Sequence, residues 1–404
     1  MPKALFLAQR IPYPPNKGEK IRYWQFFLHI AKTHTMDLGC FIDDEADWQH
    51  VPYLEGLCDK THFARMDPTG AKIRSLKGLL LGQALTEPYY YNAGLKRWTD
   101  NLLNSTDYDL VFLCSSAVGQ YVLGHPRLPA RSVMDFADVD SDKWRQYGEK
   151  QGGPMGWVYR REAVKLLDHD RALSRALGAS LYVSEAEADL FRSLSPESAA
   201  KTHAVSNGVD IDFFSPAHAF DPIVSPEPPY AVFTGTMNYW PNVEAVAWFA
   251  DKILPDLRRE RPGFGFVIVG ANPDPSVQKL GERDGITVTG RVEDVRPYLR
   301  HATVAVAPMQ TARGIQNKVL EAMAMGLKVV VSPQALEGID AQPGQDLLLA
   351  TDPAEFLDAV RRASDDADGG TLQANARKCV EDKYSWDSML RGLDRIIDDL
   401  SPAG

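Results

Sequence analysis

Short apolar runs alternate with amphipathic stretches along the whole chain. The runs predict buried strands over 4–8, 36–42, 110–114, 132–135 and 180–184, and then over 231–234, 265–269, 286–289, 303–307 and 328–331. Apolar residues at helical spacing predict helices over 21–31, 160–177, 242–259, 295–300, 316–325 and 386–400. Strands that are apolar throughout and separated by helices are typical of parallel sheets covered on both faces, so an α/β fold is predicted.

A proline-rich stretch interrupts this alternation, with four prolines between Asp221 and Pro229. Proline has a fixed φ and no amide donor, so the stretch is interpreted as a linker. We expect an N-terminal Rossmann-like domain over 1–220, a C-terminal one over 221–385, and a final helix over 386–404 that packs back on the first. Ligands of open parallel sheets bind at the carboxyl ends of the strands, so the expected site is a cleft that both domains face.

Composition narrows the class of protein. Hydrophobic residues make up 44% of the 404 residues, and 44 Lys and Arg against 54 Asp and Glu give a net charge of -10, which argues against nucleic-acid binding. The four cysteines have no C-x-x-C spacing and are expected to be thiols. The apolar stretch 4–8 is too short for a signal peptide, and no stretch reaches membrane-spanning length. We expect a cytoplasmic protein, at most peripheral to the inner face of a membrane.

The loop after the first predicted strand is a candidate anion site. Gly18 permits close approach of the backbone, and Lys17, Lys20 and Arg22 add positive charge at a helix N-terminus. The loop lacks the G-x-G-x-x-G dinucleotide fingerprint. The alternative is a proline-rich loop with solvated lysines.

Several carboxylates follow the strand predicted at 132–135. Asp138-Val139-Asp140 matches a D-x-D metal pattern, but hard cations usually need more oxygen ligands than one such pair, so no metal site is expected. An Asx turn or a helix cap is an alternative interpretation. The favoured role is that Asp138 faces an acceptor hydroxyl.

Two loops of the second half carry the remaining candidates. Gly235 follows the first strand there and allows close approach of a ligand. In the stretch 311–326, Asn317, Lys318 and Glu321 share one face of a predicted helix. This face suits a sugar nucleotide: Lys318 and the amides of Gly314, Ile315 and Gln316 would hold a diphosphate, and Glu321 would accept ribose hydroxyl hydrogen bonds. The alternative is a solvated Lys–Glu pair.

Taken together, these segments resemble the retaining glycosyltransferases of family 4, which have the two-Rossmann GT-B fold. The matching pieces occur in the right order and cover nearly the whole chain. The amino-acid sequence of these segments also resembles the sugar transferases associated with exosortase (PEP-CTERM) and exopolysaccharide gene clusters. The segments that carry the resemblance are 14–18, 183–187, the Asn-Gly-Val-Asp at 207–210, 233–237, 288–292 and the Glu-Ala-Met-Ala-Met-Gly at 321–326.

The resemblance implies transfer of a sugar from a nucleoside-diphosphate sugar, with retention and without a metal or other cofactor. Glu321 matches the family's ribose-binding glutamate, Arg291 matches the loop beside the base, and Gly18 matches the glycine loop near the diphosphate. Catalysis is then electrostatic stabilisation of the leaving diphosphate, here by Lys318, Arg313 and the amides of 314–316.

This chain departs from the family pattern at three places. Arg313 stands where the family has the first glutamate of its Glu-x7-Glu motif. Met237, Asn238 and Tyr239 stand where an Arg and a Lys are usual, and Ala137 takes the place of a histidine. We expect Arg313 and Lys318 to supply the missing positive charge.

The expected acceptor is a lipid-linked saccharide of exopolysaccharide or cell-surface glycan synthesis. Basic residues beside leucines over 72–81 (Lys72, Arg74 and Lys77 with Leu76, Leu79, Leu80 and Leu81) fit contact with a bilayer, and a buried amphipathic helix is the alternative. Two other functions stay open: a nucleotide-sugar 2-epimerase of the same fold, and a non-catalytic glycosyltransferase-like subunit.

Overall fold

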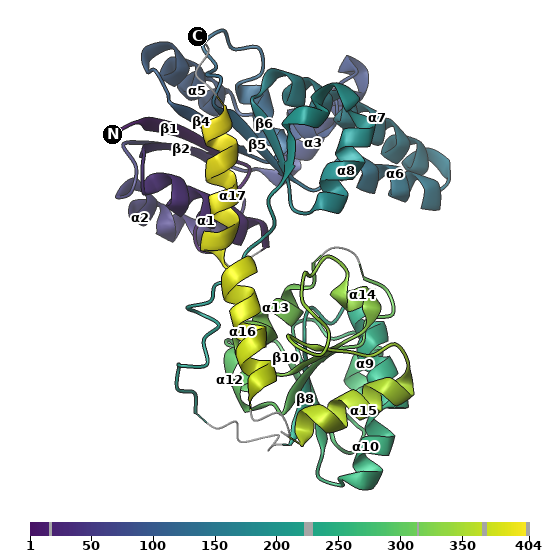
Figure 1. Cartoon of the computed structure of the whole chain (residues 1–404). Coiled ribbons are helices and arrows are strands. Elements are labelled where there is room, and N and C mark those ends of the chain that lie inside the picture. Colours follow the sequence, from purple (N-terminus) through teal and green to yellow (C-terminus); the bar gives the residue numbers. More distant parts are fainter. Residues whose placement is uncertain (16–17, 222–228, 313–314, 366–369, 401–404) are drawn as a thin grey trace. The chain divides into compact units, whose positions relative to one another are not determined.

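The computed structural model describes residues 1–15, 18–221, 229–312, 315–365 and 370–400, without the side chains of 77, 80 and 81. The chain forms two compact units, one comprising Met1–Asn207 with the chain from Leu390 onward, and the other Gly208–Met389 (Figure 1). Each unit is described by itself.

The division falls after Asn207, earlier than the boundary expected after residue 220. The Val209 amide donates to the Tyr384 carbonyl oxygen at 2.7 Å. The Arg377 guanidinium donates to the carbonyl oxygens of Ile211 at 3.1 Å and Phe214 at 2.7 Å. These bonds attach the chain after residue 207 to the second unit. Residues 222–228 of the proline-rich stretch lie outside the described residues, so their interpretation as a linker stays a prediction.

The first unit contains a parallel sheet with the strand order β3-β2-β1-β4-β5-β6-β7. The predicted apolar runs form its central strands, and Phe6 of β1 stacks on Phe112 of β4 with ring centroids 5.5 Å apart. The strands are β1 Lys3–Ala8, β2 Thr35–Ile42, β3 Lys60–Arg65, β4 Leu110–Cys114, β5 Ser132–Ala137, β6 Ala179–Tyr182 and β7 Thr202–Ala204.

The strand order reverses between β1 and β4, which places the connecting helices on both faces of the sheet. The helices of this unit are α1 Gly18–Ala31, α2 Val51–Glu55, α3 Pro68–Leu81, α4 Thr86–Tyr89, α5 Ala93–Ser105, α6 Asp140–Lys150, α7 Gly153–Ala176 and α8 Glu185–Leu194, with 3-10 helices over Glu45–His50, Ser116–Tyr121 and Pro196–Lys201.

The second unit has a smaller parallel sheet of order β10-β9-β8-β11-β12-β13. Its strands are β8 Tyr230–Thr234, β9 Gly265–Val269, β10 Ile286–Gly290, β11 Val304–Ala307, β12 Val329–Val331 and β13 Leu348–Leu349. Its helices are α9 Trp240–Lys252, α10 Leu254–Glu260, α11 Pro275–Leu280, α12 Arg296–His301, α13 Asn317–Ala324, α14 Pro333–Leu336, α15 Pro353–Ser364 and α16 Thr371–Lys383.

The single helix predicted over 242–259 is two helices, α9 and α10, in the structure. Pro255 lies in the first turn of α10. Because its ring clashes with the carbonyl one turn earlier and it has no amide donor, a continuous helix cannot pass through it.

The last helix, α17 (Trp386–Asp399), contributes its residues from Leu390 onward to the first unit. Leu393 is buried there, and the His29 ring contacts the Asp394 carboxylate at 2.6 Å. The Arg131 guanidinium donates to the Leu400 carbonyl oxygen at 2.9 Å. These contacts attach the end of the described chain to α1 and to the segment before β5 in the first unit.

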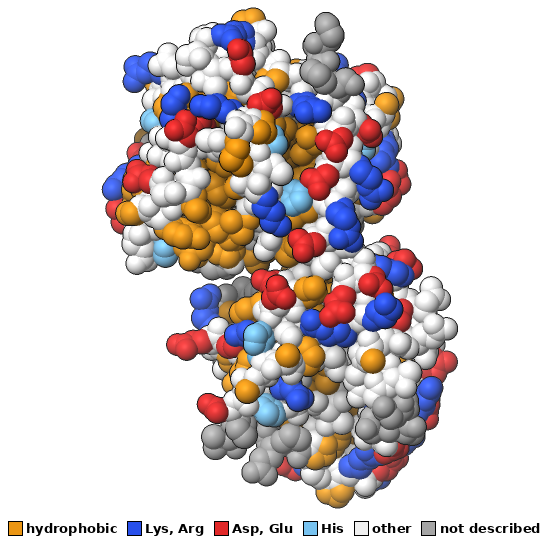
Figure 2. Space-filling view, turned by 60° about the vertical axis from the view of Figure 1, so that its left-hand side comes forward, with side chains coloured by type: hydrophobic (Ala, Val, Ile, Leu, Met, Phe, Trp, Pro, Cys, Tyr) orange, Lys and Arg blue, Asp and Glu red, His pale blue; other side chains and the backbone are white. Residues whose placement is uncertain are grey.

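None of the described helices is both long and apolar enough to cross a membrane. On the face that Figure 2 shows, acidic and basic side chains are interspersed, and the first unit carries a gathering of hydrophobic side chains. The four cysteines are free thiols, of which Cys40, Cys114 and Cys379 are buried.

Candidate functional site

Each sheet has one point where the strand order reverses, and ligands of such sheets bind beside the carboxyl ends of the strands at that point. In the first unit the point lies between β1 and β4, and in the second between β8 and β11. The loops that follow these four strands contain most of the candidate residues: 11–18 after β1, 115–116 after β4, 235–239 after β8 and 308–316 after β11.

The charges expected near Gly18 are engaged within the first unit, so the expectation that Lys20 and Arg22 serve an anion is wrong. Lys20 is buried and its ammonium donates to the Asp47 carboxylate at 2.9 Å. Arg22 is buried and donates to both oxygens of the Asp135 carboxylate, at 2.7 Å from Nη2 and 2.9 Å from Nε. Lys17 lies outside the described residues.

Arg22 also joins distant segments of the first unit. Its Nη1 donates to the Val205 carbonyl oxygen at 2.7 Å and to the Asn207 side-chain oxygen at 3.0 Å. Asn207 opens the Asn-Gly-Val-Asp motif, and the next residue, Gly208, packs on Trp386 in the second unit, where a β-carbon would come within 2.6 Å of its backbone. These two motif residues therefore make structural contacts.

Gly18 begins α1, and a β-carbon added there meets no atom within 4 Å. Alanine therefore fits, and Gly18→Ala is expected to change the free energy of unfolding by less than about 1 kcal/mol. If a ligand approaches this backbone closely, the same change lowers transfer activity. Urea denaturation beside an activity assay separates the two effects, and an unchanged activity would remove Gly18 from the site.

Asp138 follows β5 in an exposed loop, where its carboxylate accepts from the Lys143 ammonium at 2.8 Å. The same ammonium donates to Asp140 at 2.9 Å. Burial opposes the charged form of Lys143, but the Asp140 and Asp138 carboxylates raise its pKa above the ordinary value. A protein cation therefore bridges the two aspartates of the D-x-D pattern. Among the described residues, no group of three or more His, Cys, Asp or Glu is arranged to hold a metal ion.

The backbone is strained beside this loop. Ser115 after β4 has φ 80° and Ala137 at the end of β5 has φ 64°, values that non-glycine residues adopt at a cost of about 1–3 kcal/mol. The two residues belong to neighbouring strands, and the Ser115 amide donates to the Asp135 carbonyl oxygen at 2.8 Å. Glu187 secures the loop by accepting from the Val139 amide at 2.7 Å. Residues that their surroundings hold in strained backbone conformations are typical of functional sites.

In the second unit, Lys318 of α13 lies where the loops after β8 and β11 meet. Its ammonium donates to the Asn242 side-chain oxygen at 2.5 Å and lies 4.2 Å from the centre of the Phe233 ring. It is also 3.9 Å from the Met309 sulfur. Phe233 belongs to β8, Asn242 to the first turn of α9, and Met309 to the loop after β11. The lysine is thus held at the switch point by groups from three segments.

Glycines allow these segments to come together. A β-carbon at Gly235, whose φ is 155°, would lie 2.8 Å from the Asn242 amide nitrogen and 3.4 Å from the Lys318 ammonium. A β-carbon at Gly270 would lie 1.6 Å from the Gly235 carbonyl oxygen. Gly235 was expected to make room for a ligand, and in the structure it makes room for Asn242 and Lys318.

The electrostatics of α13 favour neutral forms in the free chain. Burial lowers the pKa of Lys318 to about 7, although the Glu321 carboxylate favours the charged ammonium. Burial likewise raises the pKa of Glu321 to about 7, and Lys318 opposes this shift. Lys318 and Glu321 are each half-buried, and the Lys318 ammonium donates to Asn242, so the two side chains do not form the solvated surface pair of the alternative interpretation. Such shifted groups at a strand-end site are typical of functional residues.

The other candidates of the second unit are placed as follows. Gln316 is the N-cap residue of α13, and Asn317 is exposed in its first turn. The Ile315 side chain packs against the core, which leaves only its backbone amide for a ligand. Arg291 is exposed in the turn after the edge strand β10. Arg313 and Gly314 lie outside the described residues, so their expected roles stay predictions.

Sequence reasoning missed the residues that hold Lys318. Asn242 is buried, and its amide nitrogen also donates to the Thr236 carbonyl oxygen at 3.0 Å. The signal that could have found it is its place in the first turn of the helix after β8, directly beyond the glycine loop. Phe233 and Met309 follow ordinary apolar patterns, so only the fold places them beside the ammonium.

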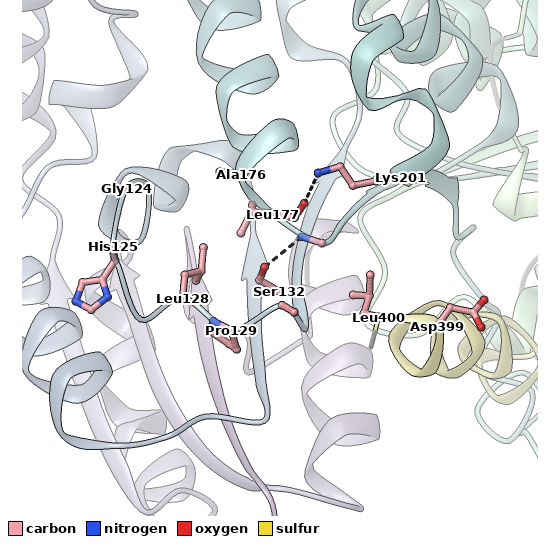
Figure 3. Close-up of a pocket in the computed structure, with 12 residues that line it drawn as sticks. Gly124, His125, Leu128, Pro129, Ser132, Ala176, Leu177, Lys201, Asp399 and Leu400 are labelled. Atoms are coloured by element: carbon pink, nitrogen blue, oxygen red, sulfur yellow. Dashed lines mark hydrogen bonds between the residues drawn. The ribbon is translucent and has the colours of Figure 1, made fainter. Parts of the chain in front are cut away.

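A cavity of about 620 Å³ lies at the opposite edge of the first sheet (Figure 3). Ser132 at the start of β5 accepts from the Gly178 amide at 3.2 Å, and Lys201 donates to the Leu177 carbonyl oxygen at 2.8 Å. The cavity is at the amino ends of β5 and β6, away from the switch point, and these polar groups are satisfied by the protein itself. We therefore do not assign substrate binding to it.

One stretch of the chain matches the model of a known protein family. Residues 228–366 match the family model described as glycosyl transferases group 1. This stretch contains β8 to β12 and α13, and hence Lys318 and Glu321. A 44.6 kDa protein in the cps region of Klebsiella pneumoniae is 20% identical over 405 residues, which cover 95% of this chain and 97% of that protein.

Solved structures share the fold of the whole chain. Sucrose-phosphate synthase from Thermosynechococcus elongatus matches with TM-score 0.65 and 16% identity, covering 98% of this chain and 99% of that one. HepE from Anabaena in complex with UDP-glucose matches with TM-score 0.64 and 13% identity, covering 98% and 99%. WaaG, a glycosyltransferase of lipopolysaccharide biosynthesis, matches with TM-score 0.61 and 14% identity, covering 97% and 99%. The predicted two-domain GT-B fold is thereby confirmed.

Proposed function

We propose that this chain is a glycosyltransferase that moves a sugar from a nucleoside-diphosphate sugar to a saccharide acceptor with retention; the matched family domain and the shared fold support this. The second unit would bind the donor, and the first unit the acceptor. The reaction would use no metal or other cofactor, because the developing charge on the diphosphate would be stabilised by the protein's own cations and amides.

The observation that carries this proposal is the position of Lys318 and Glu321 on one face of α13 at the switch point of the second sheet. Lys318 at the first turn would meet the diphosphate, together with the amides at the start of the helix. Glu321, one turn further on, would accept hydrogen bonds from the ribose hydroxyls. In the first unit, Asp138 would face the acceptor hydroxyl.

Uridine nucleotides are the first donors to test. Three structures of Anabaena HepE, which shares this fold, are complexes with UDP, with UDP and glucose, and with UDP-glucose. Arg291, exposed after β10, would lie beside the base.

A role in exopolysaccharide or cell-surface glycan synthesis, with a lipid-linked acceptor, is supported by two relatives. One is in the cps region of Klebsiella pneumoniae, and the other takes part in lipopolysaccharide biosynthesis. The narrower resemblance to exosortase-associated transferases belongs to the same proposal.

We propose that the chain works at the cytoplasmic face of a membrane, and the support for this is that α3 presents apolar side chains to solvent. Ile73 is 62% exposed and Leu76 is 60% exposed, whereas Ala71 is buried, so α3 packs one face on the first unit and turns apolar side chains of another face to solvent. Lys72 beside them is exposed as well. Exposed apolar residues with basic neighbours are typical of helices that lie on anionic bilayers.

Transfer itself tests the proposal. The full chain with UDP-glucose and a lipid extract is expected to release UDP, and the double variant Arg313→Ala/Lys318→Ala is expected to release none above background. Full UDP release by the double variant would contradict the assignment of these cations to the leaving diphosphate.

The pH dependence of donor binding provides a second test. As the pH rises through about 7, Lys318 loses its proton and with it the attraction for a diphosphate. As the pH falls through about 7, Glu321 gains a proton and becomes a poorer acceptor for ribose hydroxyls. The affinity for UDP-glucose, whose diester phosphates keep their charge here, is therefore expected to be highest near pH 7 and to fall by up to about tenfold per pH unit on either side.

Isothermal titration between pH 5.5 and 8.5 measures this profile. Glu321→Gln is expected to flatten the acid limb alone, and Lys318→Arg the alkaline limb alone. An affinity independent of pH across this interval would contradict the assignment.

A further inference from the structure

The helices α6 and α7 form an arm that projects from the first unit (Figure 1). α6 begins at Asp140, directly after the loop with Asp138 at the carboxyl end of β5, and runs for 11 residues. α7 has 24 residues, or about 36 Å of helix, and its first turns pair with α6. Its later residues pack on the body of the unit, as when Glu162 accepts from the Leu85 amide at 2.7 Å.

The two helices of the arm are tightly joined. A β-carbon at Gly148 would lie 2.7 Å from Arg160, and one at Gly156 would lie 1.8 Å from the Gln151 carbonyl oxygen. The Arg160 guanidinium donates to the Gly148 carbonyl oxygen at 2.7 Å. Close glycine contacts and this hydrogen bond fix the distance between the helices, so side chains between them are held in a defined arrangement.

Three aromatic rings gather on this arm. Trp144 and Tyr147 belong to α6 and Tyr159 to α7, and the centroids of the Trp144 and Tyr159 rings are 5.4 Å apart. The Tyr147 ring lies 6.0 Å from Trp144 and 6.1 Å from Tyr159. Tyr147 is 54% exposed, although aromatic side chains that serve only to join two helices would be covered by them. We define these three residues as the arm aromatics.

An open cavity of about 300 Å³ lies against two of them, and it is lined by Tyr147, Tyr159, Lys150 and Gln151. Among the described residues, the hydroxyls of the two tyrosines, the Lys150 ammonium and the side-chain amide of Gln151 have no hydrogen-bond partner, whereas the Gln151 backbone amide donates to the Tyr147 carbonyl oxygen at 3.0 Å. The cavity thus combines aromatic surface with free donors and acceptors, which is the usual composition of small-ligand sites.

We propose that this cavity is a saccharide subsite, which holds a neutral sugar unit of the acceptor glycan away from the reaction centre. A pyranose ring has a face of electropositive C–H groups, which matches the negative face of an aromatic ring, and a rim of hydroxyls, which matches Lys150 and Gln151. The neighbouring charges of Arg145 and Glu149 cancel in an ion pair. Lys150 therefore adds one positive charge at the cavity. This balance suits a neutral sugar better than a phosphate.

The position on the arm determines which sugar unit the subsite holds. Tyr147 lies seven residues along α6 from Asp140, or roughly 10 Å from the loop that carries Asp138. The subsite would therefore contact a unit of the glycan other than the one that accepts the donor sugar, and it would favour oligosaccharide acceptors. The inference rests on the proposed function, since it takes the first unit to bind the acceptor.

Saturation-transfer NMR with the full chain tests the subsite, and cellotetraose, maltotetraose and laminaritetraose are the probes. At least one of them is expected to bind with a dissociation constant of about 1 mM. Tyr147→Ala/Tyr159→Ala is expected to weaken that binding at least about tenfold, because both stacking faces are removed. Tyr147→Phe/Tyr159→Phe keeps the faces and is expected to bind within about threefold of the unchanged chain.

Trp157→Ala is the matched control, because Trp157 is an exposed aromatic residue of the same arm, at 56%, that does not line the cavity. It is expected to leave saccharide binding unchanged. Stabilisation by UDP, a property of the second unit, is expected in every variant, so loss of saccharide binding alone reports on the subsite and loss of UDP binding reports on the proposed function.

Two results would overturn the inference. One is the absence of binding to all three tetrasaccharides, or equal binding by the double alanine variant. The other is that the double alanine variant and Trp157→Ala lose binding to phosphatidylglycerol vesicles together while saccharides do not bind, which would make the arm a membrane contact.

Discussion

Replacing Lys318 with Met is expected to reduce sugar transfer by about 100- to 1000-fold, the usual effect of removing one donor that stabilises developing charge. The methionine keeps the length of the side chain and suits the neighbouring Phe233 ring and Met309 sulfur, so the fold is expected to persist. The substitution removes the only group among Lys318, Asn242, Phe233 and Met309 that can take up a proton and become positively charged when a diphosphate binds. Affinity for a nucleoside diphosphate should fall at least about tenfold with it.

Steady-state transfer and isothermal titration measure the two effects of Lys318→Met. Lys279→Met is a matched control, because Lys279 is an exposed lysine on α11 of the same unit. The control is expected to behave like the unchanged chain. A Lys318→Met variant that binds UDP within twofold of the unchanged chain would refute the placement of the diphosphate at α13.

Replacing Arg22 with Met is expected to lower the free energy of unfolding by about 3–5 kcal/mol. Asp135 is fully buried, and its carboxylate would lose the guanidinium that donates to both of its oxygens. The carbonyl oxygen of Val205 and the Asn207 side chain would lose their donor as well. An unpaired buried carboxylate costs far more than the pair itself contributes, because its charge has been removed from water.

Urea denaturation followed by circular dichroism measures the effect of Arg22→Met. Arg22→Met/Asp135→Leu is expected to recover most of the loss, because no buried charge is left. The surface pair of Arg65 and Glu45 offers the contrast: Arg65→Ala is expected to change stability by less than about 1 kcal/mol, since both side chains are largely exposed. A loss below about 1 kcal/mol for Arg22→Met would show that the pair is not structurally required.

The central strands could be predicted because they are apolar on both faces, and Leu110–Cys114 and Gly265–Val269 have the predicted bounds. The edge strand β3 was missed because Lys60–Arg65 is buried chiefly at Ala64 and so has no apolar run. α6 was missed for a related reason. Its eleven residues are mostly polar and offer few apolar positions to indicate a helix. The helix packs on α7 through Gly148 and the arm aromatics, and a local pattern does not show these contacts.

The part of the candidate site that lies on a single helix, α13, could be predicted from the sequence. Lys318 and Glu321 lie three residues apart, so helical geometry alone placed them on one face. The surroundings of Lys318 could not be predicted, because they depend on Phe233 and Asn242 from other elements. Arg22 was interpreted as a positive charge available to an anion because its partner, Asp135, is 113 residues away in the sequence. Long-range partners of charged residues are not visible in a local pattern.

Nucleotide binding by the second unit is the central claim, and thermal denaturation of the full chain with UDP, GDP, ADP, CMP and dTDP tests it most directly. A nucleotide present at 100 times its dissociation constant is expected to stabilise the fold by about 2.7 kcal/mol. The account predicts a clear stabilisation by one of them, with UDP the first expectation, and its loss in Glu321→Ala. Equal melting temperatures with all five nucleotides and without them would contradict the account.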